Sequence, residues 1–143
     1  MNNEQTKRPS ARKDRLVVRR AQDEVLVYDL DTNKAHCLND AAARIWNYCD
    51  GERTVADIGR CVSADIGSDV EENAVWYALA TLEKSKLLQE PVVPSELLHQ
   101  AGRRDAVRRL GLATIIAVPL VTSIMAPTPA QAASCPANEC MPP

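Results

Sequence analysis

The sequence has few of the residues from which catalytic and metal sites are usually built. Its two histidines, His36 and His99, stand far apart, no Cys-x-x-Cys pair occurs, and there is no glycine-rich phosphate loop. Structural zinc sites use ligand pairs two to four residues apart, and a catalytic nucleophile needs a base beside it. The sequence therefore predicts no enzyme and no metal site, and it indicates no cofactor.

Aromatic residues are also scarce, with two Trp, three Tyr and no Phe among 143 residues, so the core must be largely aliphatic. The formal net charge is -2, whereas a nucleic-acid partner needs a basic surface. Asp69, Glu71 and Glu72 open the third predicted helix, where a DNA-recognition helix would carry Arg or Lys. These carboxylates would repel phosphate, so the sequence predicts no nucleic-acid partner.

Three short strands are predicted in the first forty residues. The segments 16–20, 25–30 and 34–38 are rich in β-branched and other apolar residues, as strands are. The connections over 21–24 and 31–33 are short and polar, and Asp and Asn favour turns. Short connections of this kind predict an antiparallel three-stranded meander.

Three helices should follow the strands, and each is preceded by a residue that favours the N-cap position. Asn39, Thr54 and Ser68 are the predicted N-caps, and Gly51 and Gly67 end the first two helices. Apolar residues recur at helical spacing in each segment. The predicted fold class is therefore α+β, a three-stranded antiparallel meander followed by three helices, with a C-terminal apolar segment.

The five cysteines fall into two groups. Cys37, Cys49 and Cys61 are expected to be small buried hydrophobic residues, the common fate of a free cysteine. Cys135 and Cys140 lie near the C-terminus and could form a disulfide only if that end reaches an oxidising compartment.

Composition divides the chain into five parts. Residues 1–13 are polar and basic and are predicted to be disordered, residues 14–90 form the folded domain, and residues 91–102 form a linker. Residues 103–132 form a signal-like or membrane segment, and residues 133–143 form a short cysteine-containing tail.

The segment 103–132 has the order of an export signal. Arg103 and Arg104 form a twin-arginine pair, the residues from Leu110 to Met125 are apolar or small, and Ala130 and Ala132 form an Ala-x-Ala cleavage motif. Three interpretations stay open: a membrane anchor with its arginines on the cytoplasmic side, an export signal that releases the tail, and a helix buried against a partner.

The residues from Leu38 to Ile58 read LNDAAARIWNYCDGERTVADI. This stretch resembles the family of pyrroloquinoline quinone biosynthesis protein D (PqqD), whose members show Leu-Asn-x-x-Ala, an Ile-Trp-like pair and Asp-Gly-x-x-Thr-Val-x-x-Ile. The resemblance extends over about Asp14 to Glu90. One departure is Lys86, where family members often carry Gly.

The resemblance implies a winged-helix-like fold and a peptide-binding role. Such domains bind the leader of a ribosomally made precursor peptide and present it to a modifying enzyme, often a radical S-adenosylmethionine enzyme. The leader adds a strand beside the third strand and lies against the third helix. An edge strand has unpaired backbone groups that an extended peptide can satisfy. The predicted peptide-binding residues are Lys34, Ala35, His36, Cys37 and Leu38 on the edge, with Val75, Trp76 and Leu79 on the helix; the imidazole of His36 itself is expected to face solvent.

Two functional interpretations follow from this resemblance and from the C-terminal segment. In one, the domain binds a separate precursor peptide in the cytoplasm, with or without a membrane anchor. In the other, the chain is a fused precursor, and its tail is modified and then exported. Their partners are a precursor peptide, a modifying enzyme, and the membrane or an export machinery for the C-terminal segment.

Overall fold

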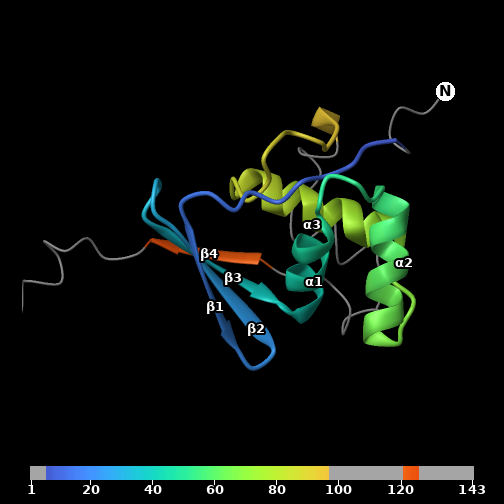
Figure 1. Cartoon of the computed structure of the whole chain (residues 1–143), viewed down its shortest axis with the longest axis horizontal. Coiled ribbons are helices and arrows are strands. Elements are labelled where there is room, and N and C mark those ends of the chain that lie inside the picture. Colours follow the sequence, from blue (N-terminus) through green and yellow to red (C-terminus); the bar gives the residue numbers. More distant parts are fainter. Residues whose placement is uncertain (1–5, 97–120, 126–143) are drawn as a thin grey trace, which may run out of the picture.

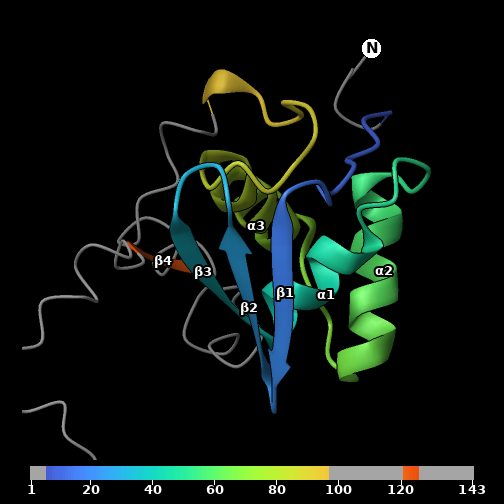
Figure 2. The same cartoon turned by 60° about the vertical axis from the view of Figure 1, so that its left-hand side comes forward.

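The computed structural model describes residues 6–96 and 121–125, which form an antiparallel sheet with helices on one of its faces (Figures 1 and 2). The sheet has four strands in the order β1-β2-β3-β4. The elements are β1 (Leu16–Ala21), β2 (Glu24–Asp29), β3 (Lys34–Asn39), α1 (Asp40–Tyr48), α2 (Val55–Ile66), α3 (Glu72–Lys84) and β4 (Val121–Met125).

The predicted meander is confirmed. In β1 and β2, Ala21 pairs with Glu24, so Gln22 and Asp23 form a two-residue turn. β2 then pairs with β3 from Asp29 opposite Lys34 to Glu24 opposite Asn39. Because side chains alternate between the faces of a sheet, every second residue of each strand points toward the helices.

β3 is not an edge strand, because β4 pairs antiparallel with its outer side. The pairing runs from Leu38 opposite Val121 to Lys34 opposite Met125. The prediction that the third strand has unpaired backbone groups is therefore wrong for this structure. β4 belongs to the C-terminal apolar segment and contains Val, Thr and Ile, which favour strands. It reaches β3 from more than eighty residues along the chain, a contact that local sequence patterns do not encode.

Two of the three predicted N-caps are confirmed, and Gly67 ends α2 as predicted, whereas α1 ends at Tyr48 with Cys49 as its C-cap, before Gly51. The side chain of Asn39 accepts a hydrogen bond from the Ala42 N–H, and Thr54 forms a capping box with Asp57. The prediction of Ser68 as the third N-cap is wrong, because the N-cap of α3 is Glu71, three residues later, and it makes no side-chain cap hydrogen bond. The residues between carry Val70 into the core, which delays the start of the helix.

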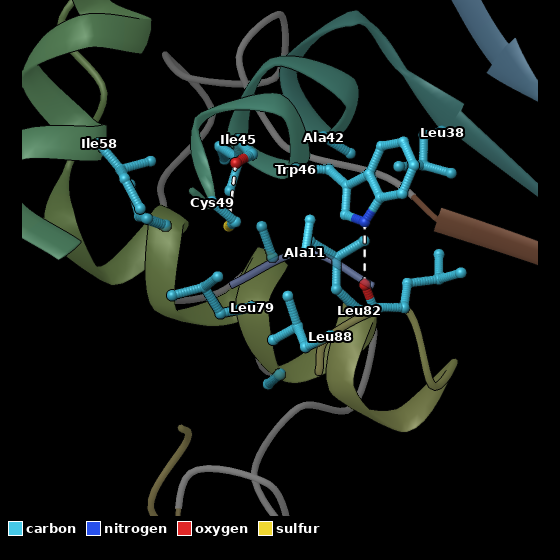
Figure 3. Close-up of a cluster of buried hydrophobic side chains, with 14 of the residues drawn as sticks. Ala11, Leu38, Ala42, Ile45, Trp46, Cys49, Ile58, Leu79, Leu82 and Leu88 are labelled. Atoms are coloured by element: carbon cyan, nitrogen blue, oxygen red, sulfur yellow. Dashed lines mark hydrogen bonds between the residues drawn. The ribbon is translucent and has the colours of Figure 1, made fainter. Parts of the chain in front are cut away.

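The core lies between the helices and the helix-facing side of the sheet, and its largest fully buried side chain is Trp46 (Figure 3). The indole N–H donates a 2.9 Å hydrogen bond to the carbonyl of Leu87, which ties α1 to the chain after α3. Most other core residues are aliphatic, as the lack of Phe predicts. Cys49 is buried as expected, whereas Cys37 and Cys61 are half-buried.

Both ends of the domain are packed more closely than predicted. Disorder over 1–13 is wrong for residues 9–12, because Ala11 is buried and its N–H bonds the carbonyl of Cys49 at 2.7 Å. At the other end, Val92 and Val93 belong to the core although they lie in the predicted linker. Their backbone N–H groups donate to the carboxylate of Glu83.

Lys86 provides a test of the turn that follows α3. Its φ is +58°, in the left-handed region that costs a residue with a side chain roughly 1–2 kcal/mol. Because glycine avoids this cost but loses more chain entropy, about 0.5–1 kcal/mol, Lys86→Gly should raise the free energy of unfolding by about 0.5–1 kcal/mol, measured by urea denaturation. Lys84→Gly, two residues earlier and within α3, should lower it by a similar amount. Equal destabilisation by both substitutions would contradict the role of the turn.

Candidate functional site

The most distinctive feature of the molecule is the junction of β3 with β4. The pairing of these strands covers five successive positions of β3, from Lys34 to Leu38. These are the five residues that the sequence predicts to hold a peptide backbone. The structure thus places an extended segment on the outer side of β3, and the segment comes from the same chain (Figure 1).

Alternate residues of the two strands face the helices. Leu38 is a fully buried core residue, and Val121 opposite it packs against the same core. Two residues along, His36 lies opposite Ser123 on the same face. The intervening pair, Cys37 with Thr122, and the pair after His36, Ala35 with Ile124, lie on the outer face of the sheet, where Ile124 is 65% exposed.

A polar cavity of about 290 Å³ opens where this junction meets the C-terminal end of α3. Its wall is formed by β3, β4 and the last turn of the helix together with the residues that follow it. The lining residues include Lys34, His36, Val121, Ser123, Thr81, Lys84 and Ser85. The cavity is therefore a groove that runs along the added strand and that α3 closes on one side.

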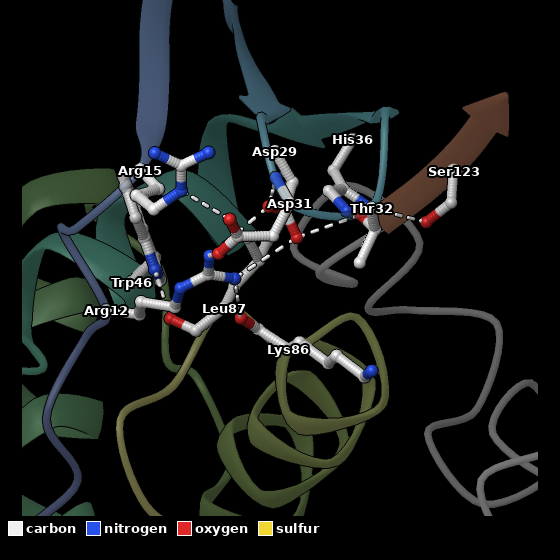
Figure 4. Close-up of polar contacts among 10 residues, drawn as sticks. All are labelled: Arg12, Arg15, Asp29, Asp31, Thr32, His36, Trp46, Lys86, Leu87 and Ser123. Carbon is white, nitrogen blue, oxygen red and sulfur yellow. Dashed lines mark hydrogen bonds and ion pairs between the residues drawn. The ribbon is translucent and has the colours of Figure 1, made fainter. Parts of the chain in front are cut away.

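His36 occupies the middle of the junction and is buried, with 1% of its surface exposed. The expectation that it faces solvent is wrong, because β4 and the end of α3 lie over it. Its Nδ1 lies 2.7 Å from the hydroxyl oxygen of Ser123, and Figure 4 marks this contact with a dashed line. Among the described residues its Nε2 has no hydrogen-bond partner. Burial lowers the pKa of His36, and the charge of Lys34 adds to this effect against the opposing charge of Asp29.

The predicted helix residues lie beneath the groove rather than along it. Val75 and Leu79 are fully buried in the core, and Trp76 is 8% exposed, with its indole N–H 3.3 Å from the Glu72 carboxylate. Tyr77 is half-buried. The exposed wall comes instead from the next turn of α3, at Thr81, Lys84 and Ser85. Sequence reasoning missed these polar residues because it sought an apolar stripe.

The remaining predicted strand residues divide between the two faces of the sheet. Lys34 is exposed, and Ala35 is buried although it lies on the outer face of the sheet, away from the helices. The thiol of Cys37 donates to the carboxylate of Glu24 at 3.3 Å. Partial burial raises the pKa of the Cys37 thiol, and the hydrogen bond and negative charge of Glu24 raise it further.

A buried carboxylate fixes the turn between β2 and β3, at the end of the groove (Figure 4). Asp29 is fully buried and accepts hydrogen bonds from both terminal nitrogens of Arg12, at 3.1 and 3.2 Å. The N–H of Asp31 and the hydroxyl of Thr32 also donate to it. Arg12 in turn donates to the carbonyl of Lys86, so the turn, the N-terminal segment and the end of α3 are held together.

The described residues contain neither a candidate metal centre nor a candidate membrane span. Among residues 6–96 and 121–125, no cluster of three or more His, Cys, Asp or Glu side chains could hold a metal ion. The same residues contain no helix long and apolar enough to cross a bilayer. The predicted export residues, Arg103, Arg104, Ala130 and Ala132, lie outside the described residues, as do Cys135 and Cys140.

Comparison with known proteins gives one match. Residues 24–88, which include β2, β3 and all three helices, match the model of the family described as Coenzyme PQQ synthesis protein D (PqqD). No curated protein and no solved structure matches the chain.

The Asp29 carboxylate generates a prediction about stability and pH. Its burial alone would raise its pKa, but the hydrogen bonds from Arg12, Asp31 and Thr32 outweigh burial and lower the pKa from 3.8 to about 2. The ionised group therefore stabilises the fold above pH 3.8, and this contribution is lost as the pH falls toward about 2.

Asp29→Asn should lower the free energy of unfolding at pH 7 by about 1–3 kcal/mol, because it leaves buried donors poorly paired. The variant should also lose the part of the pH dependence between pH 4 and pH 2, as measured by urea denaturation at a series of pH values. Asp31→Asn is the matched control, because Asp31 also bonds Arg12 but its side chain is 47% exposed. An equal loss in both variants would contradict the special role of Asp29.

Proposed function

Because residues 24–88 match the PqqD family, we propose that this chain is a peptide-recognition protein that holds a ribosomally made precursor peptide as an added strand on β3. Domains of this family bind peptides in modification pathways and act without catalysis of their own. The modifying enzyme, a radical S-adenosylmethionine enzyme in many such pathways, would receive the peptide from the groove. Recognition would take place in the cytoplasm, where precursor peptides are made.

The observation that carries the proposal is the pairing of β4 with β3. A strand that lies at the end of a meander has free N–H and C=O groups along one side, and each unpaired group is a binding site for another extended chain. In this protein a distant segment satisfies them over the whole length of the site. Main-chain hydrogen bonds supply affinity in such complexes, and the alternating side chains supply selectivity.

The predicted contact residues fit this role in different ways. Lys34, Ala35, His36, Cys37 and Leu38 would provide the backbone ladder, since all five are paired with a strand here. Val75, Trp76 and Leu79 would act from beneath by holding α3 at the correct distance from β3. Thr81 and Lys84 would contact the side chains of the bound peptide.

A second function is favoured by the origin of β4. Because the added strand belongs to the same chain, the chain is also a candidate for a fused precursor. In it, residues 121–125 act as the leader, and the residues after them are modified and exported. A tethered segment binds at a high effective concentration. Intact mass spectrometry of the protein from its own cells tests this function: a mass change within residues 126–143, or a chain that ends at Ala132, would support it. An unmodified full-length chain would favour a separate precursor peptide.

A double proline substitution tests the binding site itself. Ser123→Pro combined with Ile124→Pro should release β4 from β3. Successive N–H groups of a strand point to opposite sides, so one of these two N–H groups is directed toward β3. Proline has no N–H, so the double substitution removes that hydrogen bond. The outward amides of β3, which are the backbone N–H groups that point toward β4, should then exchange with solvent at least about tenfold faster. This exchange is measured by NMR.

Addition of a synthetic peptide of residues 117–129 in excess should restore the protection of these amides. A peptide of the same composition in scrambled order is the control. If the prolines leave the exchange of β3 unchanged, or if the peptide and its scrambled control act alike, β3 is not a site of strand addition.

A further inference from the structure

His36 contacts a side chain of the added strand and could distinguish one residue type from another at that position. It lies opposite Ser123 on the face that points toward the helices, midway along the pairing. The Ser123 hydroxyl is 2.7 Å from its Nδ1 and is the hydrogen-bond partner that the described residues give to this imidazole. Figure 4 shows the imidazole and the hydroxyl directed toward one another across the two strands.

The cost of an unsatisfied imidazole makes this contact selective. His36 is 1% exposed when the strand is in place, so a strand that covers it removes it from water. A covering residue without a polar group would leave both ring nitrogens without a partner among the described residues, and an unpaired buried polar group is costly. The lowered pKa keeps the ring neutral near pH 7, with one donor nitrogen and one acceptor nitrogen.

A hydroxyl suits this neutral ring better than other side chains do. Serine and threonine can both donate and accept, so they pair with Nδ1 in either tautomer. They are also small enough for the face between β3 and α3, where the next helix-facing neighbour is the buried Leu38. At that neighbouring position the added strand carries Val121, which packs against the core.

We propose that His36 is the specificity-determining residue of the strand-addition site and that it selects peptides with Ser or Thr opposite to it, two residues after an aliphatic residue opposite Leu38. The ligand class is therefore an extended peptide with the pattern aliphatic-x-Ser/Thr. The inference rests on the proposed function and adds the chemical selectivity of its binding site. Residues 121–123, Val-Thr-Ser, satisfy the pattern within the chain itself.

The first experiment uses the full chain and the amide exchange of β3. Ser123→Ala should raise the exchange of the outward β3 amides about tenfold, because it leaves the buried imidazole without its partner. Ser123→Thr should keep the wild-type rate. Ile124→Ala is the matched control: it shortens a side chain of the same strand on the outer face, so its effect should be clearly smaller.

A specificity swap distinguishes selection from a general structural role. His36→Val replaces the polar partner by an apolar β-branched residue that suits a strand. In this background Ser123→Ala should no longer accelerate exchange, because loss of both polar partners leaves no unsatisfied group. The same reversal is expected in trans, when peptides of residues 117–129 with Ser or Ala at position 123 are titrated onto the double proline variant, either with His36 retained or with His36→Val added.

The outcomes separate this inference from the proposed function. Preference for the hydroxyl with His36 and its loss in the His36→Val variant supports the assignment. Equal binding of the Ser and Ala forms while β3 remains protected would overturn the role of His36 and leave strand addition intact. Unprotected β3 amides in the wild-type chain would overturn both.

Discussion

The structure depends on one constraint, which is that the backbone groups along the outer side of β3 must be paired. A meander of three strands with helices on one face leaves these groups at an edge, and an open edge pairs readily with any extended chain. α3 lies alongside this edge, so a strand that joins β3 also lines a groove that the end of α3 closes on one side. In this chain residues 121–125 pair with β3 and form one wall of this groove. The same pairing that completes the sheet is the interaction by which, in the proposed function, a peptide would bind.

The rest of the domain keeps that groove in a fixed shape. Asp29 holds the turn before β3, and Arg12 links this carboxylate to the carbonyl of Lys86 after α3. Trp46 ties α1 to the same segment through the carbonyl of Leu87. Strand addition requires a β3 and an α3 that do not move apart, because the affinity of a preformed site is not reduced by the cost of ordering it. Buried polar contacts at the corner of the sheet therefore help to fix the positions of β3 and α3.

Local features of this fold could be read from the sequence, and long-range contacts could not. The caps at Asn39 and Thr54 act within four residues, so their signals are visible in the chain and both are confirmed. Ser68 carries the same local signal, yet Val70 turns into the core and its N–H bonds the Ser63 hydroxyl at 2.9 Å, so tertiary packing decides where α3 begins. The burial of His36 depends on β4. Sequence analysis did not identify these five residues as a strand, because they lie within a longer apolar segment that resembles an export signal. The sequence predicted β3 as a strand, but it did not predict that residues 121–125 pair with it.

The most direct test of the account is a disulfide between β3 and β4. Cys37 lies opposite Thr122, and directly opposed residues of antiparallel strands are close enough for such a bond. In a Cys135→Ser, Cys140→Ser background, Thr122→Cys should cross-link to Cys37 under mild oxidation, as mapped by mass spectrometry of the unreduced peptides. Ser123→Cys, whose side chain points to the other face, should not. A cross-link with Thr122→Cys alone would establish both the added strand and its register. Equal cross-linking of the two variants, or none with either, would contradict the claim that β3 recognises an extended segment in this way.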